Sequence, residues 1–343
     1  MGILSSFNRE LAIDLGTSNS IVIYNDQIVA DEPTVLLWNK KTEAGICFGQ
    51  AALSVDGLEN YPDLECILPL MGGSIADFEA ASLFIGGMMA ITKPKWSLGQ
   101  PVKRVVVCIP IGLCNVEERA VREAFEQCGV KEIRMIHAPI AAALGMGIDV
   151  FQPVGRMIVD IGGGKTDVAV VSNGEIVLSS SICIAGRVFD EDIVKYMLNQ
   201  HGMKIGMQMA EKIKMAVGAA SDEIGVELDD FKVLGKDAAT QSPKEMMIGY
   251  KEVAHALDTS IGKIERTILQ TLEETPSDLK RDIRNKGIYL TGGGALLREM
   301  VSRLSASTGL QVHFAEDPLR TIARGTAVAL KNFDTYPFLT TIR

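Results

Sequence analysis

Apolar and polar positions follow two different spacings along the chain, and together they predict both strands and helices. Residues 105–110 form a continuous run, Val-Val-Val-Cys-Ile-Pro, of the length expected for a buried strand. From Val116 to Gln127 the apolar residues recur at spacings of three and four among charged residues, which predicts an amphipathic helix. Strands that alternate with helices in this way indicate an α/β protein.

Two stretches rich in small residues predict further helices. The segment from Ile136 to Gly145 contains Ala141-Ala142-Ala143 and predicts a closely packed helix. Later in the chain, Ile288-Tyr289-Leu290 predicts a strand that runs into Thr291-Gly292-Gly293-Gly294, and a helix from Ala295 to Ser305 is expected behind it. This places a glycine-rich loop between a strand and a helix.

An internal repeat is the most informative feature of the sequence. The run Ala12-Ile13-Asp14-Leu15-Gly16 is matched 146 residues later by Ile158-Val159-Asp160-Ile161-Gly162. At an offset of 148, Asn25-Asp26-Gln27-Ile28-Val29 is matched by Asn173-Gly174-Glu175-Ile176-Val177. Each copy predicts a β-hairpin with a buried first strand, an aspartate, a tight turn with glycine and a second strand. Two such copies imply two similarly folded halves that face one another.

The chain length indicates two globular domains, and the net charge argues against one class of partner. A chain of 343 residues is too long for one core and suggests two domains of about 150 residues each. The net charge of -9 arises from interspersed acids and bases, which argues against nucleic acid as a partner. The polar, acidic segment from about 222 to 245 predicts a peripheral lobe of the second half.

The remaining composition points to a cytoplasmic protein. The six cysteines contain no CxxC pair and no zinc-finger spacing with the four histidines, so free thiols are expected and a zinc site is not. No apolar run approaches the roughly 20 residues of a spanning helix, and the first residues lack the pattern of a signal peptide. We therefore expect a cytoplasmic location.

The two hairpin turns carry the residues that a nucleoside triphosphate needs. Gly16-Thr17-Ser18-Asn19 and Gly162-Gly163-Gly164-Lys165-Thr166 can bring backbone amides close to β- and γ-phosphates, since glycine permits close approach. Asp14 and Asp160 can face a Mg²⁺ ion between them. Either turn alone is better explained as a tight hairpin turn. The repeated aspartate and the third loop, Thr291-Gly292-Gly293-Gly294, which suits adenosine, together favour a nucleotide site, whereas no P-loop or Rossmann fingerprint is present.

Five segments resemble the phosphate, adenosine and closing motifs of the MreB family of bacterial actin homologues. They are LAIDLGTSNS, MIVDIGGGKTDVAVV, AEKIKMAVG, GIYLTGGGALLREM and AEDPLRTIARGTAVAL, which lie in the family's order between about residues 10 and 332. The resemblance implies an actin-like α/β fold, in which two duplicated ribonuclease H-like domains, each with a small accessory subdomain, surround a central nucleotide cleft. The implied boundaries are 1–31, 64–150 and 318–343 for subdomain IA, 32–63 for IB, 151–184 and 245–317 for IIA, and 185–244 for IIB.

The same resemblance implies what the protein does and which residues do it. It implies an ATP- and Mg²⁺-dependent filament of paired antiparallel protofilaments at the inner face of the plasma membrane, working with the cell-wall elongation proteins to maintain cell shape. Asp14 and Asp160 would lie beside Mg²⁺, and the two turns would hold the phosphates of ATP or ADP. Glu211 and Lys214 would approach the ribose, and Gly292, Gly293, Gly294 and Ala295 the adenosine.

This chain departs from the family pattern at three positions. Ala138 precedes Pro139 where the family has a glutamate that is thought to orient the attacking water, so hydrolysis must rely on Thr166 or His137, or be lost. Loss of one water-orienting group is expected to cost about a hundredfold or more in rate. Lys165 replaces a threonine and either neutralises a γ-phosphate oxygen or points to solvent, and Ala216 replaces a glutamate near the nucleoside. Sequence drift in an active enzyme is the alternative interpretation of all three.

Two apolar segments are candidates for contact with an anionic membrane surface. The first is the N-terminus, through Met1, Ile3, Leu4 and Phe7. The second is the loop at residues 93–98, where Trp96 and Leu98 stand among basic residues, at the place of the family's membrane-insertion loop. A packed core position for Trp96 is the alternative.

Three other functions compete with a nucleotide-gated filament. A scaffold that binds ATP without turning it over is favoured by Ala138. A small-molecule kinase on the same fold would need a base near the γ-phosphate, for which Asp167 is the candidate. A heat-shock-type chaperone would need a peptide-binding domain, for which no room is expected after residue 332.

Overall fold

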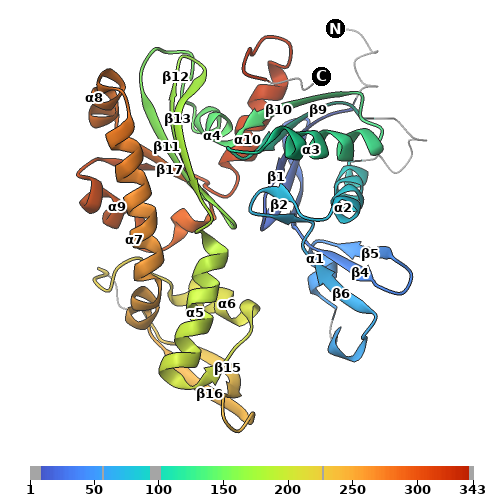
Figure 1. The fold of residues 1–343 in the computed structure, drawn as a ribbon, viewed down its shortest axis with the longest axis vertical. Coiled ribbons are helices and arrows are strands. Elements are labelled where there is room, and N and C mark those ends of the chain that lie inside the picture. Colours follow the sequence, from blue (N-terminus) through green and yellow to red (C-terminus); the bar gives the residue numbers. More distant parts are fainter. Residues whose placement is uncertain (1–8, 56–57, 93–101, 226–227, 340–343) are drawn as a thin grey trace. The chain divides into compact units, whose positions relative to one another are not determined.

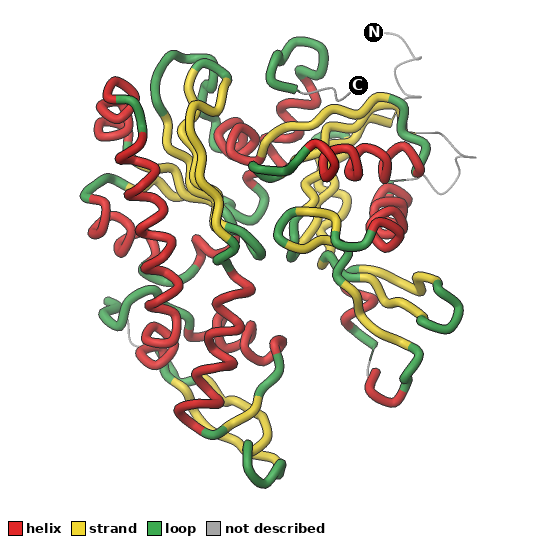
Figure 2. The backbone as a smooth tube through the Cα atoms, viewed as in Figure 1, coloured by secondary structure: helices red, strands yellow, loops and turns green. Residues whose placement is uncertain are grey.

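The computed structural model describes residues 9–55, 58–92, 102–225 and 228–339. The chain divides into two compact units, and each unit is built from more than one segment of the chain. Unit 1 contains Met1–Gln152, Asn173–Glu175 and Arg320–Arg343, and unit 2 contains Pro153–Ser172 and Ile176–Leu319. Figure 2 shows that each unit combines a large sheet with helices and a separate smaller sheet. The finer division into four subdomains stays a prediction.

The large sheet of unit 1 has five strands. In spatial order they are β10 (Glu132–His137), β9 (Val102–Ile109), β1 (Arg9–Leu15), β2 (Asn19–Tyr24) and β3 (Gln27–Pro33). β1 is parallel to β9 and antiparallel to β2, so β1 and β2 form the first predicted hairpin (Figure 1). The strand predicted at residues 105–110 is confirmed as part of β9.

Helices cover both faces of this sheet. On one face, Leu11, Ile13 and Leu15 of β1 pack in a core with helices α2 (Phe78–Ile91) and α3 (Asn115–Gln127), and α3 confirms the helix predicted there. On the other face, Ala12 packs against Ala323 of helix α10 (Thr321–Lys331). Successive residues of a strand point to opposite faces of the sheet. Whether a β1 residue has an odd or an even number therefore decides which helices it contacts.

The predicted alanine-rich helix is present but begins later than expected. Helix α4 spans Ala138–Gly145, whereas Ile136 and His137 are the last residues of β10. Pro139 explains the boundary, since proline lacks an amide N–H and is tolerated only in the first turn of a helix. The prediction of a helix from Ile136 was therefore wrong by two residues. Its predicted close packing is confirmed, and the structure shows that α10 is the partner.

A smaller three-stranded sheet completes unit 1. It consists of β5 (Ala44–Phe48), β4 (Leu36–Asn39) and β6 (Leu64–Ile67), with the short helices α1 (Gln50–Leu53) and η2 (Leu58–Asn60) and the two-stranded β7 (Leu70–Met71) and β8 (Ser74–Ile75) nearby in the chain. Val35, Leu37 and Ala52 form its own small core.

The large sheet of unit 2 repeats the arrangement of unit 1. Its order is β13 (Glu175–Ile182), β12 (Thr166–Ser172), β11 (Arg156–Ile161), β17 (Ile288–Thr291) and β18 (Val312–Phe314). Helices α7 (Tyr250–Glu274), α8 (Ser277–Lys286) and α9 (Met300–Thr308) accompany this sheet. The helix predicted from Ala295 is corrected, because a short 3₁₀ turn, η3 (Gly293–Leu296), precedes α9, and Glu299 between them has a left-handed φ of 60°.

A smaller lobe extends unit 2. It contains helices α5 (Gly186–His201) and α6 (Met207–Val217) and the three-stranded sheet β14 (Met203–Lys204), β15 (Phe231–Asp237) and β16 (Pro243–Ile248). β15 and β16 account for the polar segment that was predicted to form a peripheral lobe. Phe189, Ile213 and Val233 of the lobe belong to the same buried core as Val159 and Val168 of the large sheet, so lobe and sheet are packed together.

The internal repeat is confirmed as a shared strand–turn–strand structure. Each of the two predicted hairpins is antiparallel, β1 with β2 and β11 with β12. In each copy the next turn has positive φ at both central residues, Asn25 and Asp26 in the first and Asn173 and Gly174 in the second. Such turns match the twist of β-hairpins and favour Asn, Asp and Gly, which explains why the sequence repeats at these positions.

Candidate functional site

The turn between β1 and β2 is held by hydrogen bonds from Thr34. The Thr34 hydroxyl donates to the Gly16 carbonyl at 2.7 Å, and the Thr34 amide donates to the Ser18 carbonyl at 2.8 Å. A β-carbon on Gly16 would stand only 2.3 Å from the Asn19 carbonyl oxygen, so no other residue fits this turn. These contacts fix the carbonyls of the turn and with them the directions of its amides.

The polar side chains of this turn contact other parts of unit 1. The Thr17 hydroxyl accepts a bond of 3.0 Å from the Gly73 amide. The Asn19 side chain donates to Asp31, which is also held by two bonds of 3.0 and 3.1 Å from Arg320. Thr17 and Asn19 therefore support the turn, which can offer a phosphate its backbone amides and the Thr17 hydroxyl proton, since the bond from Gly73 does not use that proton.

Asp14 lies near the end of β1, two positions before Gly16. Burial and the nearby negative charge of Asp31 raise the pKa of the Asp14 carboxyl to about 7. A cation beside this carboxyl would stabilise its charged form, so Asp14 fits the expected role next to a metal ion.

Asp160 occupies the matching place in unit 2, on β11 between Asp167 of β12 and Thr291 of β17. Gly292 comes directly after β17 and has a φ of 87°, and a β-carbon there would stand 2.3 Å from an Asp160 carboxylate oxygen. The glycine thus makes room for the carboxylate. Within the residues that the structure describes, no three His, Cys, Asp or Glu side chains form a metal-ligand group. A single carboxylate per unit still fits Mg²⁺, which keeps waters and takes its other oxygens from phosphates.

The turn after Asp160 is bonded to the start of helix α5. The amide of Gly186 donates to the Gly162 carbonyl at 3.1 Å, and the amide of Arg187 donates to the Gly163 carbonyl at 2.8 Å. Within the turn, the Gly162 amide donates to the carbonyl of Lys165 at 3.0 Å. The Lys165 side chain is half-buried, as are the three glycines before it. This second turn is therefore also shaped by neighbouring backbone.

Thr166 is fully buried at the start of β12. Its hydroxyl donates to the Ile184 carbonyl at 2.6 Å, which uses its only proton. The hydroxyl can still accept a bond, but it cannot donate one to a water without losing the contact with Ile184.

The third loop lies against β11. A β-carbon on Gly294 would stand 2.3 Å from the side chain of Ile161, so this loop packs directly on the strand that ends in the second turn. Ala295 is buried next to it, and a β-carbon on Gly293 would meet only the end of the Leu319 side chain, at 3.1 Å. Unit 2 thus brings the loop 292–295, the turn 162–166 and Asp160 into one region.

The predicted ribose residues differ in their surroundings. Glu211 of α6 is exposed. Lys214, one turn later, is half-buried, and its Nζ lies 2.8 Å and 2.9 Å from the two oxygens of Asp190 and 3.0 Å from the Gly186 carbonyl. Asp190 was not among the residues predicted from sequence. The signal for it was available, because Asp190 lies on the side of α5 that buries Phe189, Ile193 and Met197.

Comparison with known proteins assigns the family. The sequence pattern of the family described as MreB/Mbl protein matches residues 8–337. The chain belongs to the MreB/Mbl family. It is 38% identical over 333 residues to cell shape-determining protein MreB of Escherichia coli (strain K12), which covers 96% of the chain and 95% of that protein. It is 36% identical over 332 residues to cell shape-determining protein Mbl of Bacillus subtilis (strain 168), with 96% and 98% covered.

Solved structures support the same assignment. MreB5 of Spiroplasma citri bound to AMPPNP superimposes with a TM-score of 0.88 at 31% identity, covering 95% of this chain and 97% of that one. The MamK double helical filament, at 17% identity, superimposes with a TM-score of 0.79 over 94% of this chain and 99% of that one, and is similar in fold. The predicted actin-like α/β fold is thereby confirmed for this member of the MreB/Mbl family.

His137, a predicted water-orienting residue in this MreB/Mbl protein, lies on a different face of the sheet from Asp14. Asp14 is in register with Cys108 of β9, and Cys108 with Ile136 of β10. His137 is the next residue of β10, in register with Ile109, and Ile109 belongs to the core on the α2 and α3 side. Neighbouring residues in register share a face, so the register separates His137 from Asp14.

Ala138, by contrast, begins α4, which packs with α10 on the Asp14 side of the sheet. Ala138 is 6% exposed. The position of the family's glutamate is therefore occupied by a buried methyl group, which can neither accept nor donate a hydrogen bond.

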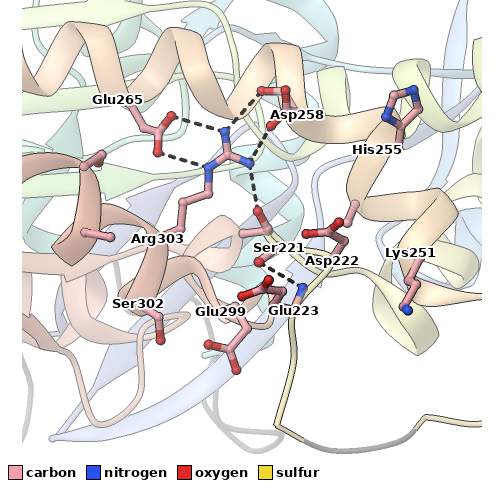
Figure 3. Close-up of a pocket in the computed structure, with 14 residues that line it drawn as sticks. Ser221, Asp222, Glu223, Lys251, His255, Asp258, Glu265, Glu299, Ser302 and Arg303 are labelled. Atoms are coloured by element: carbon pink, nitrogen blue, oxygen red, sulfur yellow. Dashed lines mark hydrogen bonds and ion pairs between the residues drawn. The ribbon is translucent and has the colours of Figure 1, made fainter.

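One cavity of unit 2 is lined by none of the predicted site residues of this MreB/Mbl protein. It has a volume of about 760 Å³ and is lined by α7, α9 and the segment after α6 (Figure 3). Arg303 crosses its wall, bonded to Glu265 at 3.0 and 3.2 Å, to Asp258 at 2.9 Å and to the Ala220 carbonyl at 2.8 Å. These bonds join three segments of unit 2, which explains the half-buried guanidinium as a structural element.

The predicted membrane contacts lie outside the described residues. They are Met1, Ile3, Leu4, Phe7, Trp96 and Leu98. Among the described helices, none combines the length and the apolar character needed to cross a membrane.

Proposed function

We propose that this chain is a nucleotide-gated filament protein of the MreB/Mbl family that binds ATP with Mg²⁺ and turns it over slowly. The observation that carries the proposal is the duplicated turn: an aspartate followed by a glycine turn whose carbonyls are fixed by neighbouring donors, once in each unit. This arrangement holds backbone amides ready for phosphates at little entropic cost on binding. Two related structures, both of MreB5 of Spiroplasma citri, are bound to AMPPNP and to ADP, respectively.

Each group would have a defined part in nucleotide binding. The amides of residues 16–19 and 162–166 would donate to β- and γ-phosphate oxygens, and Lys165 would add a positive charge at the γ-phosphate. Asp14 and Asp160 would hold Mg²⁺ through its waters, and that ion would neutralise phosphate charge. The loop from Gly292 to Ala295 would receive the adenosine, with Glu211 near the ribose.

Slow turnover follows from the groups near the γ-phosphate. Phosphoryl transfer to water needs an acceptor that orients the water, and Ala138 offers none. The Thr166 hydroxyl, which donates to the Ile184 carbonyl, could accept a hydrogen bond from a water but is too weakly basic to take its proton. The strand register directs His137 to the other face of its sheet. The ATP-bound filament would consequently persist, so this chain would act mainly as a scaffold.

Filament assembly would be coupled to the nucleotide only if ATP is bound more tightly by the polymerising form than by the monomer. One fold relative, MamK, forms a double helical filament. We further propose paired antiparallel protofilaments at the inner face of the plasma membrane, with the N-terminus and the loop at 93–98 in contact with anionic lipid. The cell-wall elongation proteins would be the partners of such a filament.

Sedimentation and electron microscopy with AMPPNP, ATP or ADP and Mg²⁺ test this proposal. We expect pelletable filaments with AMPPNP and ATP, fewer with ADP, and none for Asp160→Asn. Anionic vesicles of phosphatidylglycerol should recruit the filaments, and neutral phosphatidylcholine vesicles should not. A chain that stays monomeric at high concentration with every nucleotide, with and without vesicles, would overturn the proposal.

A further inference from the structure

A buried ion pair lies beside the second glycine turn and is not used by the chemistry proposed above. The side chains of Lys214 and Asp190 are 17% and 10% exposed. Lys214 places its Nζ within 2.8 to 3.0 Å of both Asp190 oxygens and of the Gly186 carbonyl. Two of the three N–H donors of the ammonium group are used by hydrogen bonds to one Asp190 oxygen and to the Gly186 carbonyl, while the other Asp190 oxygen, at 2.8 Å, is held as an ion pair. Lys214 is therefore held by protein partners, and its approach to the ribose stays a prediction.

The residues that Lys214 contacts are the residues that shape the turn. Gly186 accepts from Lys214 through its carbonyl and donates through its amide to Gly162 at 3.1 Å. The adjoining amide, of Arg187, bonds the carbonyl of Gly163 at 2.8 Å. Gly186 thus connects the Lys214 ammonium group to the turn. The hydrogen bond from the Thr166 hydroxyl to the Ile184 carbonyl holds the segment just before Gly186 to strand β12.

A turn of three consecutive glycines needs such external support. Gly162, Gly163 and Gly164 have wide backbone freedom, and holding them in one conformation costs more entropy than for other residues. Amides that are already aimed at the phosphates bind them more tightly than amides that must be ordered on binding. Support for the turn thus translates into phosphate affinity.

From this arrangement we infer that Asp190 and Lys214 are positioning residues, which hold the start of α5 and, through it, the turn 162–166 in the conformation that binds phosphates. A buried ion pair contributes little net stability compared with apolar residues of the same size, so stability alone does not account for it. The pair also joins α6 to the turn, so a change at the phosphate end would alter the position of α6. This inference rests on the proposed function, because it assumes that the turn binds phosphates.

Binding measurements on three proteins test the inference. Wild type, Asp190→Asn and Glu191→Gln are titrated with AMPPNP, ADP and adenosine in the presence of Mg²⁺. Glu191 is the matched control, since it is the next residue of α5, its side chain is 43% exposed, and its ion pair is a long one of 3.8 Å to Arg187. We expect Asp190→Asn to weaken AMPPNP and ADP at least tenfold and adenosine less than twofold, and Glu191→Gln to change none of them. Asp190→Glu, which keeps the charge, should recover part of the lost affinity.

The outcomes separate this inference from the proposal on which it rests. If wild type binds AMPPNP and Asp190→Asn binds it within twofold of wild type, the positioning role is overturned while the proposed function stands. An equal loss for adenosine and AMPPNP would indicate a general structural role and would also overturn the inference. A wild type that binds no nucleotide would overturn the proposed function itself. Circular dichroism and thermal melting check the fold, and Lys214→Gln is the second variant if Asp190→Asn does not fold.

Discussion

Gly325 of α10 lies so close to Ala141 of α4 that a β-carbon at position 325 would stand 1.7 Å from the Ala141 carbonyl oxygen. In the same contact between the two helices, a β-carbon on Gly145 of α4 would stand 1.9 Å from the Thr321 carbonyl of α10. The two backbones are therefore in direct contact. This contact holds α10, which comes from the end of the chain, against α4 on the Asp14 face of the sheet.

Replacement of Gly325 by alanine should destabilise unit 1. The added methyl group would force the helices apart, and overpacking of this kind costs about 1–3 kcal/mol or more in the free energy of unfolding. Gly262→Ala is the matched control, because Gly262 also lies in a helix but its β-carbon would meet only side-chain ends at 3.8 and 4.0 Å. We expect the control to be neutral or stabilising by up to about 1 kcal/mol, as alanine favours helix. Urea denaturation measures both, and equal effects would contradict the interpretation of the contact.

Gly292→Ala should abolish nucleotide binding. A β-carbon at this position would stand 2.3 Å from Asp160 and would occupy a φ of 87° that L residues rarely adopt. We expect at least a hundredfold loss of AMPPNP affinity together with a loss of about 2 kcal/mol or more of stability. Gly206→Ala, whose β-carbon would meet no atom within 4 Å, is the control and should change affinity less than fivefold. Calorimetric titration of both variants decides, and similar losses in the two would refute the steric explanation.

The stability of the nucleotide-free protein should depend on the protonation of Asp190. Burial raises the pKa of Asp190 to about 6, with Lys214 and Arg187 opposing the shift and Glu211 adding to it. A carboxyl whose folded pKa lies above its unfolded value adds stability that is complete below about pH 4 and is lost as the pH rises through 6. Asp190→Asn lacks this dependence. From pH 4 to pH 7 the free energy of unfolding of wild type should therefore fall by about 2–3 kcal/mol relative to that of Asp190→Asn.

Urea denaturation of wild type and Asp190→Asn across pH 4 to 8 measures this shift. Glu191→Gln serves again as the control and should keep a constant difference from wild type. Parallel pH profiles for wild type and Asp190→Asn would show that Asp190 titrates normally. A stable Asp190→Asn variant with weak phosphate binding would indicate that this charge is kept for function at some cost in stability.

Restoration of a glutamate at position 138 should raise ATP turnover. Glutamate can accept a proton or a hydrogen bond from the attacking water, and we expect Ala138→Glu to release phosphate about a hundredfold faster than wild type under polymerising conditions. Ala138→Gln, of the same size but without the basic carboxylate, should gain less than tenfold. Phosphate release is measured beside filament mass. No gain for Ala138→Glu would mean that another residue orients the water in wild type.

Much of the candidate site could be predicted from sequence because its parts are local. A turn needs glycine at defined positions, and the repeat of Asp14-Leu15-Gly16 as Asp160-Ile161-Gly162 reveals two such turns without any knowledge of long-range contacts. Helix α3 was equally readable, since its apolar spacing lies within one element. The helix boundaries at Ala138 and Met300 were misplaced, because the strand register of β10 and the left-handed Glu299 decide them.

By itself, the sequence determined two similar α/β halves, the aspartate and glycine turns in each and the family to which they point, because backbone propensity and short repeats are local properties. The tertiary structure alone decided which helices share a face, how β10 is registered against β9 and which buried charges meet. That His137 and Asp14 face opposite sides of one sheet follows from strand pairing across more than a hundred residues. That Lys214 pairs with Asp190 follows from the packing of α5 on α6, since such contacts depend on the arrangement of whole elements and leave no regular spacing in the chain.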